Sequence, residues 1–182
     1  MPSWRLDILC EDRRTERFVR QLCERSSIQV LEVHSAPSAR GDASAWVRLY
    51  YPIYAAKLRS KNFQRKRGLL VVIDGDNHGF AARKIELDEQ LKAAHVPPRA
   101  PADPIAIFVP TWSIETWLSE LCGRGPVLES QPLKDASADR DLWADGQSEK
   151  ACLQTAANAW RKIPTSLPSL EDAYSEGSRF QM

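Results

Sequence analysis

Two aspartates, Asp74 and Asp76, directly follow five apolar residues in the middle of the chain. An unbroken apolar run such as 69–73 is typical of a strand buried on both faces of a parallel sheet. Ligands bind beyond the carboxyl ends of such strands, so we expect both acids to lie where a site can form. Neighbouring carboxylates repel each other, and a hard cation such as Mg2+ or Mn2+ relieves this. A plain strand-to-helix turn, with an Asp cap and a glycine that supplies a positive φ, explains the residues equally well.

Two further acids follow other apolar segments. Glu11 follows the segment 5–10, and Glu115 lies in the first turn of a helix expected to begin at Ser113, after the strand 105–109. Because the carboxyl ends of parallel strands meet at one edge of a sheet, three strand ends would deliver acids to the same place. This constellation suits metal-assisted phosphoryl transfer, in which divalent ions activate water. Taken singly, Glu11 is also explained as a solvated turn acid and Glu115 by the helix dipole.

One segment, 57–67, is strongly basic and contains no acid, although the net charge of the chain is only +1. Its cations would bind phosphates, and Phe63 among them could stack on a base. A solvated helix end feeding the next strand explains the same residues at least as often. The basic residues are Lys57, Arg59, Lys61, Arg65, Lys66 and Arg67.

Hydrophobic periodicity predicts the elements that would position these residues. Strands alternate with helices along the chain, which predicts the α/β class with a mainly parallel, Rossmann-like sheet and helices on both faces, in three layers. The segment 123–148 is predicted to be a loop, and 149–182 a C-terminal helical segment. The expected strands are 5–10, 28–33, 69–73 and 105–109, and the expected helices are 12–23, 46–58 (kinked at Pro52), 77–96, one from Ser113, 150–162 and a short one at 170–174.

Composition limits the function classes. The 182 residues, 43% apolar and 27% charged, predict one soluble globular domain. No apolar stretch approaches the roughly 18 residues of a membrane span, and the N-terminus lacks a signal-peptide pattern. Four scattered cysteines without a Cys-x-x-Cys argue against zinc and predict a reduced, cytoplasmic protein. Phosphate-binding glycine loops and a nucleophile elbow are absent from the sequence, so ATP, dinucleotide or serine-nucleophile chemistry is unsupported.

Three motifs, in this order, resemble those of TOPRIM-domain proteins. The residues 9–11, followed by 14–16, look like the first motif, a strand ending in Glu with an acid in the next helix. The residues 72–76 look like the Asp-x-Asp motif. The segment 110–118 resembles the Pro-x-x-x-Ile-Glu-x-Trp-Leu segment of small standalone TOPRIM proteins and of the overcoming-lysogenization-defect (OLD) nucleases. The resemblance covers roughly residues 5–122, with a weaker match at Lys150.

The resemblance implies a single TOPRIM-like domain with Mg2+- or Mn2+-dependent nuclease activity. In it Glu11, Asp74 and Asp76 would hold metal. Glu16 and Glu115 would complete a second metal site or orient water, and a basic side chain would stabilise the charged transition state. The resemblance assigns this last role to Lys150. The ordinary explanation of Lys150 is an exposed lysine at the start of a helix. The sequence departs from the family at Asp12, where a Gly is usual, and at Glu16, where Asp is commoner.

The resemblance also suggests partners. Nucleic acid, with DNA the first candidate, would be the substrate. Many OLD-like nucleases carry or recruit an ABC-type ATPase, and several such pairs act against phage. This chain has no ATPase motif, so a separately encoded ATPase is expected, and a homodimer is a further expectation.

Two alternatives remain open on the sequence. One is a different enzyme: an NYN/PIN-type RNase, suggested by Asp-Gly-Asp-Asn, or a haloacid-dehalogenase-like phosphatase with Asp74 as nucleophile. A requirement for Glu11 would favour TOPRIM over both. The other is an inactive TOPRIM-fold subunit that binds DNA or an ATPase, with exposed tryptophans as contact residues. The candidates for those contacts are Trp112, Trp117 and Trp143.

Overall fold

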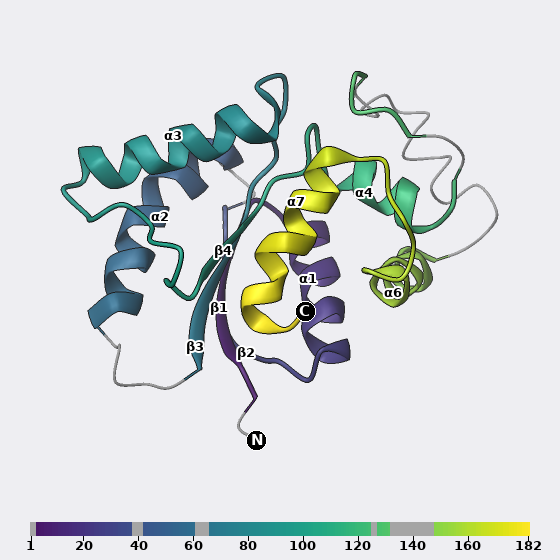
Figure 1. Cartoon of the computed structure of the whole chain (residues 1–182), viewed down its shortest axis with the longest axis horizontal. Coiled ribbons are helices and arrows are strands. Elements are labelled where there is room, and N and C mark those ends of the chain that lie inside the picture. Colours follow the sequence, from purple (N-terminus) through teal and green to yellow (C-terminus); the bar gives the residue numbers. More distant parts are fainter. Residues whose placement is uncertain (1–2, 38–41, 61–65, 125–126, 132–147) are drawn as a thin grey trace.

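Four parallel strands form one sheet in the order β2-β1-β3-β4 (Figure 1). They are β1 (Arg5–Cys10), β2 (Gln29–Ser35), β3 (Arg67–Val72) and β4 (Ile105–Phe108). The computed structural model describes residues 3–37, 42–60, 66–124, 127–131 and 148–182. Strands β1, β3 and β4 are buried along almost their whole length, whereas β2 is partly exposed at one edge. The apolar run before Asp74 therefore lies in a strand of a parallel sheet that is buried on both faces, as predicted.

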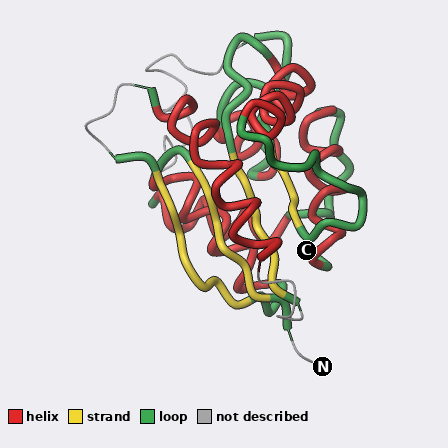
Figure 2. Tube along the Cα trace, turned by 90° about the vertical axis from the view of Figure 1, so that its left-hand side faces the viewer, coloured by secondary structure: helices red, strands yellow, loops and turns green. Residues whose placement is uncertain are grey.

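Helices cover both faces of the sheet, which confirms the predicted α/β, Rossmann-like class. Helices α2 (Ala43–Ser60) and α3 (Gly79–Ala93) cover one face. The other face is covered by α1 (Arg13–Arg25), α4 (Ile114–Leu121), α6 (Glu149–Ala159) and α7 (Pro168–Gly177), followed by the short 3-10 helix η1 (Ser178–Phe180). Figure 2 shows the strands side by side with helices in front of and behind them. Two apolar cores, one on each face, complete the three layers.

Most predicted elements are present with shifted ends. Helix α2 continues on both sides of Pro52, and α7 is longer than the predicted short helix, with Pro168 in its first turn. The buried face of α3 carries Arg83 with Leu87 and Leu91, whereas Ile85 is 60% exposed. None of the described helices combines the length and the apolar character needed to cross a membrane.

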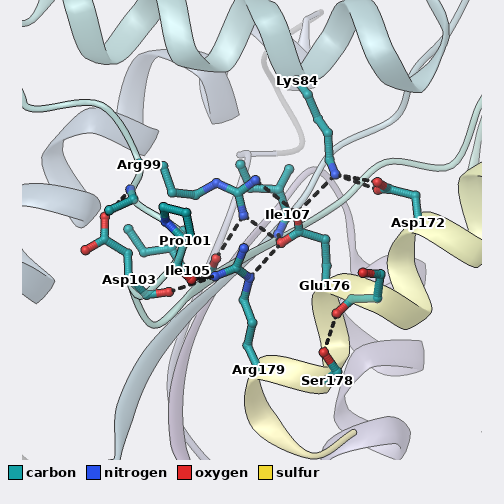
Figure 3. Close-up of polar contacts among 12 residues, drawn as sticks. Lys84, Arg99, Pro101, Asp103, Ile105, Ile107, Asp172, Glu176, Ser178 and Arg179 are labelled. Carbon is teal, nitrogen blue, oxygen red and sulfur yellow. Dashed lines mark hydrogen bonds and ion pairs between the residues drawn. The ribbon is translucent and has the colours of Figure 1, made fainter.

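Glu176 fastens α7 to the outer edge of β4. Its buried carboxylate accepts hydrogen bonds from Arg99 Nη1 at 2.6 Å, Lys84 Nζ at 3.1 Å and Arg179 Nε at 3.2 Å (Figure 3). It also accepts the backbone N–H of Ile107 in β4 at 3.3 Å. Burial opposes ionisation, but the cations, Arg99 foremost, lower the pKa of Glu176 to about 2. The carboxylate therefore stabilises the folded state in its charged form.

Replacing Glu176 with glutamine is expected to lower the free energy of unfolding at pH 7 by about 2–3 kcal/mol. Because the folded pKa lies below the ordinary value of 4.5, this contribution is complete above about pH 4.5 and is lost as the pH falls toward 2. The wild type should thus lose stability over that interval more steeply than E176Q. Urea denaturation from pH 7 to pH 2.5 measures this. E171Q, an exposed carboxylate on the same helix, is the control, and equal slopes for E176Q and wild type would contradict the prediction.

Candidate active site

Glu11 and the turn that contains Asp74 meet at the carboxyl edge of the sheet. Strands β1 and β3 are neighbours, and Cys10 lies opposite Val72, so the residues that follow them emerge side by side. The Oε1 atom of Glu11 accepts a hydrogen bond of 2.7 Å from the backbone N–H of Asp74. The structure therefore brings together the first and second of the three acidic segments that the sequence predicts.

The turn itself is held against the loop that follows β4. The N–H of Gly75 donates to the carbonyl of Pro110 at 2.8 Å, and the N–H of Asp76 donates to that of Trp112 at 3.1 Å. A Cβ atom on Gly75 would lie 2.3 Å from the carbonyl oxygen of Thr111, so this position needs glycine for close backbone approach. The positive φ predicted for a glycine of this stretch occurs at Gly79, at 76°. Asp76 also has a positive φ, at 49°, which Asp tolerates better than most residues.

Arg83 lies directly behind the acidic turn and is only 1% exposed. Its Nε donates to the carbonyl of Asp74 at 2.9 Å, its Nη1 to Glu86 at 2.6 Å, and its Nη2 lies 3.3 Å from Oδ2 of Asp76. A buried guanidinium is tolerated when its donors are satisfied and its charge is paired. Arg83 thus fixes the turn and offsets part of its negative charge. Sequence reasoning did not identify it.

The environment of Glu11 disfavours its charged form. Burial raises the pKa of Glu11 to about 7, although the hydrogen bond from Asp74 opposes the rise. The negative charge of Asp76 adds to the rise, and the positive charge of Arg83 works against it. Burial is therefore the main reason that the charged form of Glu11 is disfavoured. A cation bound beside Glu11 would favour that charged form.

A divalent ion held mainly by water fits these residues. Within the described ranges, no group of three or more His, Cys, Asp or Glu side chains could hold a metal ion. Mg2+, however, usually takes only one or two carboxylates and keeps several waters, and Glu11 with Asp74 or Asp76 meets that need. The hydroxyl of Thr111, on the loop against Gly75, is buried and has no hydrogen-bond partner among the described residues. Such a group suits a metal-bound water.

The two remaining predicted acids are each paired with an arginine. Glu115 pairs with Arg14, which ties the start of α4 to the start of α1. Burial favours the neutral form of Glu115, but side-chain hydrogen bonds, including that from Arg14, lower its pKa. Glu16 pairs with Arg20 one turn along α1 at 2.8 Å. The structure thus pairs Glu115 with the start of α1, next to Glu11, and Glu16 with its own helix.

Lys150 lines a hollow between α1 and α6, and the described lining residues of that hollow do not include the acidic turn. The hollow has a volume of about 330 Å³. Arg17 pairs across it with Glu149 at 2.9 Å, whereas Lys150 forms no ion pair within the described part of the chain. Because α1 begins just after Glu11, the hollow lies along the helix that leads away from the acids. Its lining residues are Arg17, Arg20, Gln21, Glu149, Lys150 and Leu153.

The described members of the predicted basic cluster lie at the opposite edge of the sheet. Helix α2 runs back from the carboxyl edge to the amino edge, and β3 starts there (Figure 1). Arg67 is largely buried, with 10% of its side chain exposed, and pairs with Asp7. Lys61 and Arg65 lie outside the described residues, as does Phe63. The other ion pairs of the cluster are Lys57 with Glu32 at 3.3 Å and Arg59 with Asp103 at 2.6 Å, and Lys66 completes the described members.

The tryptophans proposed as contact residues have different environments. Trp117 is fully buried, and its Nε1 donates to the hydroxyl of Ser169 at 2.8 Å, so it is a core residue. Trp112 is partly exposed and donates to the carbonyl of Glu129 at 2.9 Å. Trp143 lies outside the described residues. Of the three, Trp112 alone has a described surface that a partner could contact.

The chain was compared with protein-family models, curated proteins and solved structures, and none of them matches it.

Proposed function

We propose that the chain is a Mg2+- or Mn2+-dependent nuclease with a TOPRIM-like site, and that DNA is its substrate. The observation that carries the proposal is the hydrogen bond from the N–H of Asp74 to Glu11, which couples acids from two neighbouring strand ends. The order of the three acidic motifs in the sequence supports it as well. The TOPRIM assignment itself rests on that resemblance.

The residues of the proposed site have different roles. Glu11 and the Asp74–Asp76 turn would hold the ion, and Arg83 holds the turn from behind. A bound divalent ion would supply an activated water and stabilise charge on the scissile phosphate. Gly75 keeps the turn against the loop after β4, so that the carboxylates stay at a fixed place on the edge. Fixed placement of this kind is what lowers the barrier of phosphoryl transfer.

The nucleic-acid backbone would follow α1 toward the hollow. Exposed Arg13 lies two residues after Glu11, and the hollow beside α6 carries three basic residues against one acid. Arg13 and Lys150 form no ion pair within the described ranges, so both are available to phosphates. The described members of the cluster at 57–67 lie at the other edge of the sheet, and three of them are paired with acids, as are Arg17 and Arg20 of the α1 surface. The cluster remains a prediction, and the α1 surface is preferred because it begins beside Glu11.

Replacing Arg13 and Lys150 together with glutamine is expected to weaken DNA binding roughly 5- to 30-fold at 0.1 M salt and to reduce the salt slope by about 2. Fluorescence anisotropy with a labelled duplex in Ca2+, over a salt series, measures both quantities. The matched control is K57Q/K66Q, which removes two charges at the opposite edge. A larger loss of DNA binding in K57Q/K66Q than in the Arg13 and Lys150 double variant would indicate that the DNA backbone contacts the predicted basic cluster instead.

The function itself is tested with the purified wild-type chain. Supercoiled plasmid DNA and single-stranded RNA are incubated with it in Mg2+, Mn2+ or EDTA, and Mn2+ binding is followed by calorimetry. Metal-dependent cutting of DNA is the expected result. Cutting of RNA alone would favour an NYN/PIN-type RNase, and an acyl-phosphate trapped on Asp74 would favour a phosphatase. Mn2+ binding with no cutting, even with an added ATPase, would indicate an inactive binding subunit.

An ABC-type ATPase partner, a role against phage, a homodimer and a cytoplasmic location stay predictions. They come from the sequence, and the geometry of the site does not bear on them.

A further inference from the structure

Two cysteines that are far apart in the sequence lie in contact in the fold. Cys122 ends α4, and Cys152 lies in the first half of α6. Their Sγ atoms are 3.0 Å apart, and the Sγ of Cys122 also lies 3.5 Å from the carbonyl oxygen of Cys152. Neither cysteine is in a disulfide bond. A disulfide bond is about 2.05 Å long, so the two sulfurs need to approach by only about 1 Å.

The pair differs from the other two cysteines. Cys10 and Cys23 are fully buried on β1 and α1, and neither has a second sulfur within contact distance. Cys152 is also fully buried, whereas Cys122 is partly exposed at the end of its helix. An oxidant from solvent can therefore reach the sulfur of Cys122, whereas the sulfur of Cys152 is shielded in the core. The sequence, which lacks a Cys-x-x-Cys, gives no sign of this arrangement.

We propose that Cys122 and Cys152 form a reversible disulfide, linking α4 to α6, when the protein is exposed to a peroxide. Hydrogen peroxide takes two electrons from the Cys122 sulfur, leaving a sulfenic acid and one water. The Cys152 sulfur then attacks that sulfenic sulfur, the S–O bond breaks, and the disulfide forms with release of a second water. Two thiols and one peroxide thus give one disulfide and two waters. A dithiol reductant reverses the bond by exchange.

The geometry also predicts that the reaction is slow. The hydrogen bond to Cys152, together with burial, raises the pKa of the Cys122 thiol well above its usual range. The thiolate is the reactive form, so little of it is present near neutral pH. The bond should therefore form faster at pH 9 than at pH 7.

The link would join two helices that carry predicted site residues. Helix α4 bears Glu115 in its first turn, and α6 bears Lys150 at its start. A cross-link between them closes the chain from residue 122 to residue 152 and restricts the unfolded state. The inference stands on the sulfur geometry alone and does not depend on the nuclease proposal.

The test begins with the wild-type chain, treated with one to ten equivalents of hydrogen peroxide at pH 9. The protein is then denatured with an alkylating agent and digested without reduction. Mass spectrometry is expected to show two of the four thiols lost and one linked pair of peptides, containing Cys122 and Cys152. Dithiothreitol should restore all four. Unchanged thiols, a sulfinic acid on Cys122, a link to Cys10 or Cys23, or a dimer through Cys122 would each overturn the proposal.

Thermal unfolding provides the second readout. Oxidation is expected to raise the wild-type Tm by roughly 5–10 °C. C122S and C152S, treated identically, should show no rise and no linked peptides. C122S is the gentler variant because this side chain is partly exposed. A rise of the same size in C122S would show that oxidation acts elsewhere in the chain.

Discussion

Replacing Glu11 with glutamine, or Asp76 with asparagine, is expected to lower metal-dependent cleavage of supercoiled DNA by about 100-fold or more, because a metal supplies several kcal/mol of transition-state charge stabilisation. Both variants should still fold. Glutamine keeps an oxygen to accept the N–H of Asp74 and removes a charge that burial and Asp76 disfavour. Asparagine at position 76 tolerates the positive φ that Asp76 adopts. Loss of activity would then reflect lost metal binding.

Metal binding by the same variants is measured by thermal unfolding, without a cleavage assay. Mn2+ should raise the Tm of the wild type, because a ligand that binds only the folded state stabilises it, and should do so much less in E11Q. E24Q and D88N remove exposed acids elsewhere on α1 and α3 and are the controls. Full cleavage in E11Q would show that Glu11 is a plain turn acid. If the variants do not fold, the acids are needed for the fold itself.

The sequence predicts the central part of this site because strong local signals coincide with topology. Five apolar residues before Asp74 are readable as a buried strand, and the alternation of elements makes that strand parallel to the one before Glu11. In a parallel sheet the two following turns must lie at the same edge. That reasoning places Glu11 beside Asp74 before any coordinates are known, and the 2.7 Å hydrogen bond agrees with it.

The position of the basic cluster follows from the same topology. Because the cluster is close to Asp74 in the sequence, it is easily assumed to be close to Asp74 in space as well. Arg67 is only seven residues from Asp74, yet Arg67 begins β3 and Asp74 lies beyond the far end of that strand. A strand rises about 3.3 Å per residue, so its two ends are about 20 Å apart. Arg67 is also held by Asp7 at the start of the sheet. Charge composition detects such a cluster, whereas the direction of the strand decides which edge it occupies.

The features that the sequence does not reveal depend on partners remote in the chain. The need for glycine at Gly75 comes from the carbonyl of Thr111, and the Cys122 pair comes from the packing of α4 on α6. Arg83 is a charged residue on the buried face of a helix, where periodicity predicts an apolar one. Its spacing with Leu87 and Leu91, four and eight residues on, is the one available signal. Only the acids around it explain why it is buried.

Replacing Arg83 with methionine is expected to destabilise the protein by about 1–3 kcal/mol, because the acceptors that Arg83 contacts lose a donor. Methionine fills much of the volume, so the loss reports on the polar contacts more than on a cavity. Three acceptors lose a donor: the carbonyl of Asp74, Glu86 and Asp76. Urea denaturation at pH 7 measures the change. K92M, an exposed cation on the same helix, is the control and should change stability by less than about 0.5 kcal/mol.

A double-mutant cycle identifies the source of that loss. If unpaired negative charge near the turn causes it, adding D76N or E86Q to R83M should cost less than each change costs in the wild type, with a coupling of about 0.5–3 kcal/mol. Asp76 is the more informative partner, since it also raises the pKa of Glu11. Strict additivity would mean that Arg83 acts through the Asp74 carbonyl and through packing. Coupling would show instead that one charge balance governs both the stability of the turn and the acids proposed to hold the metal.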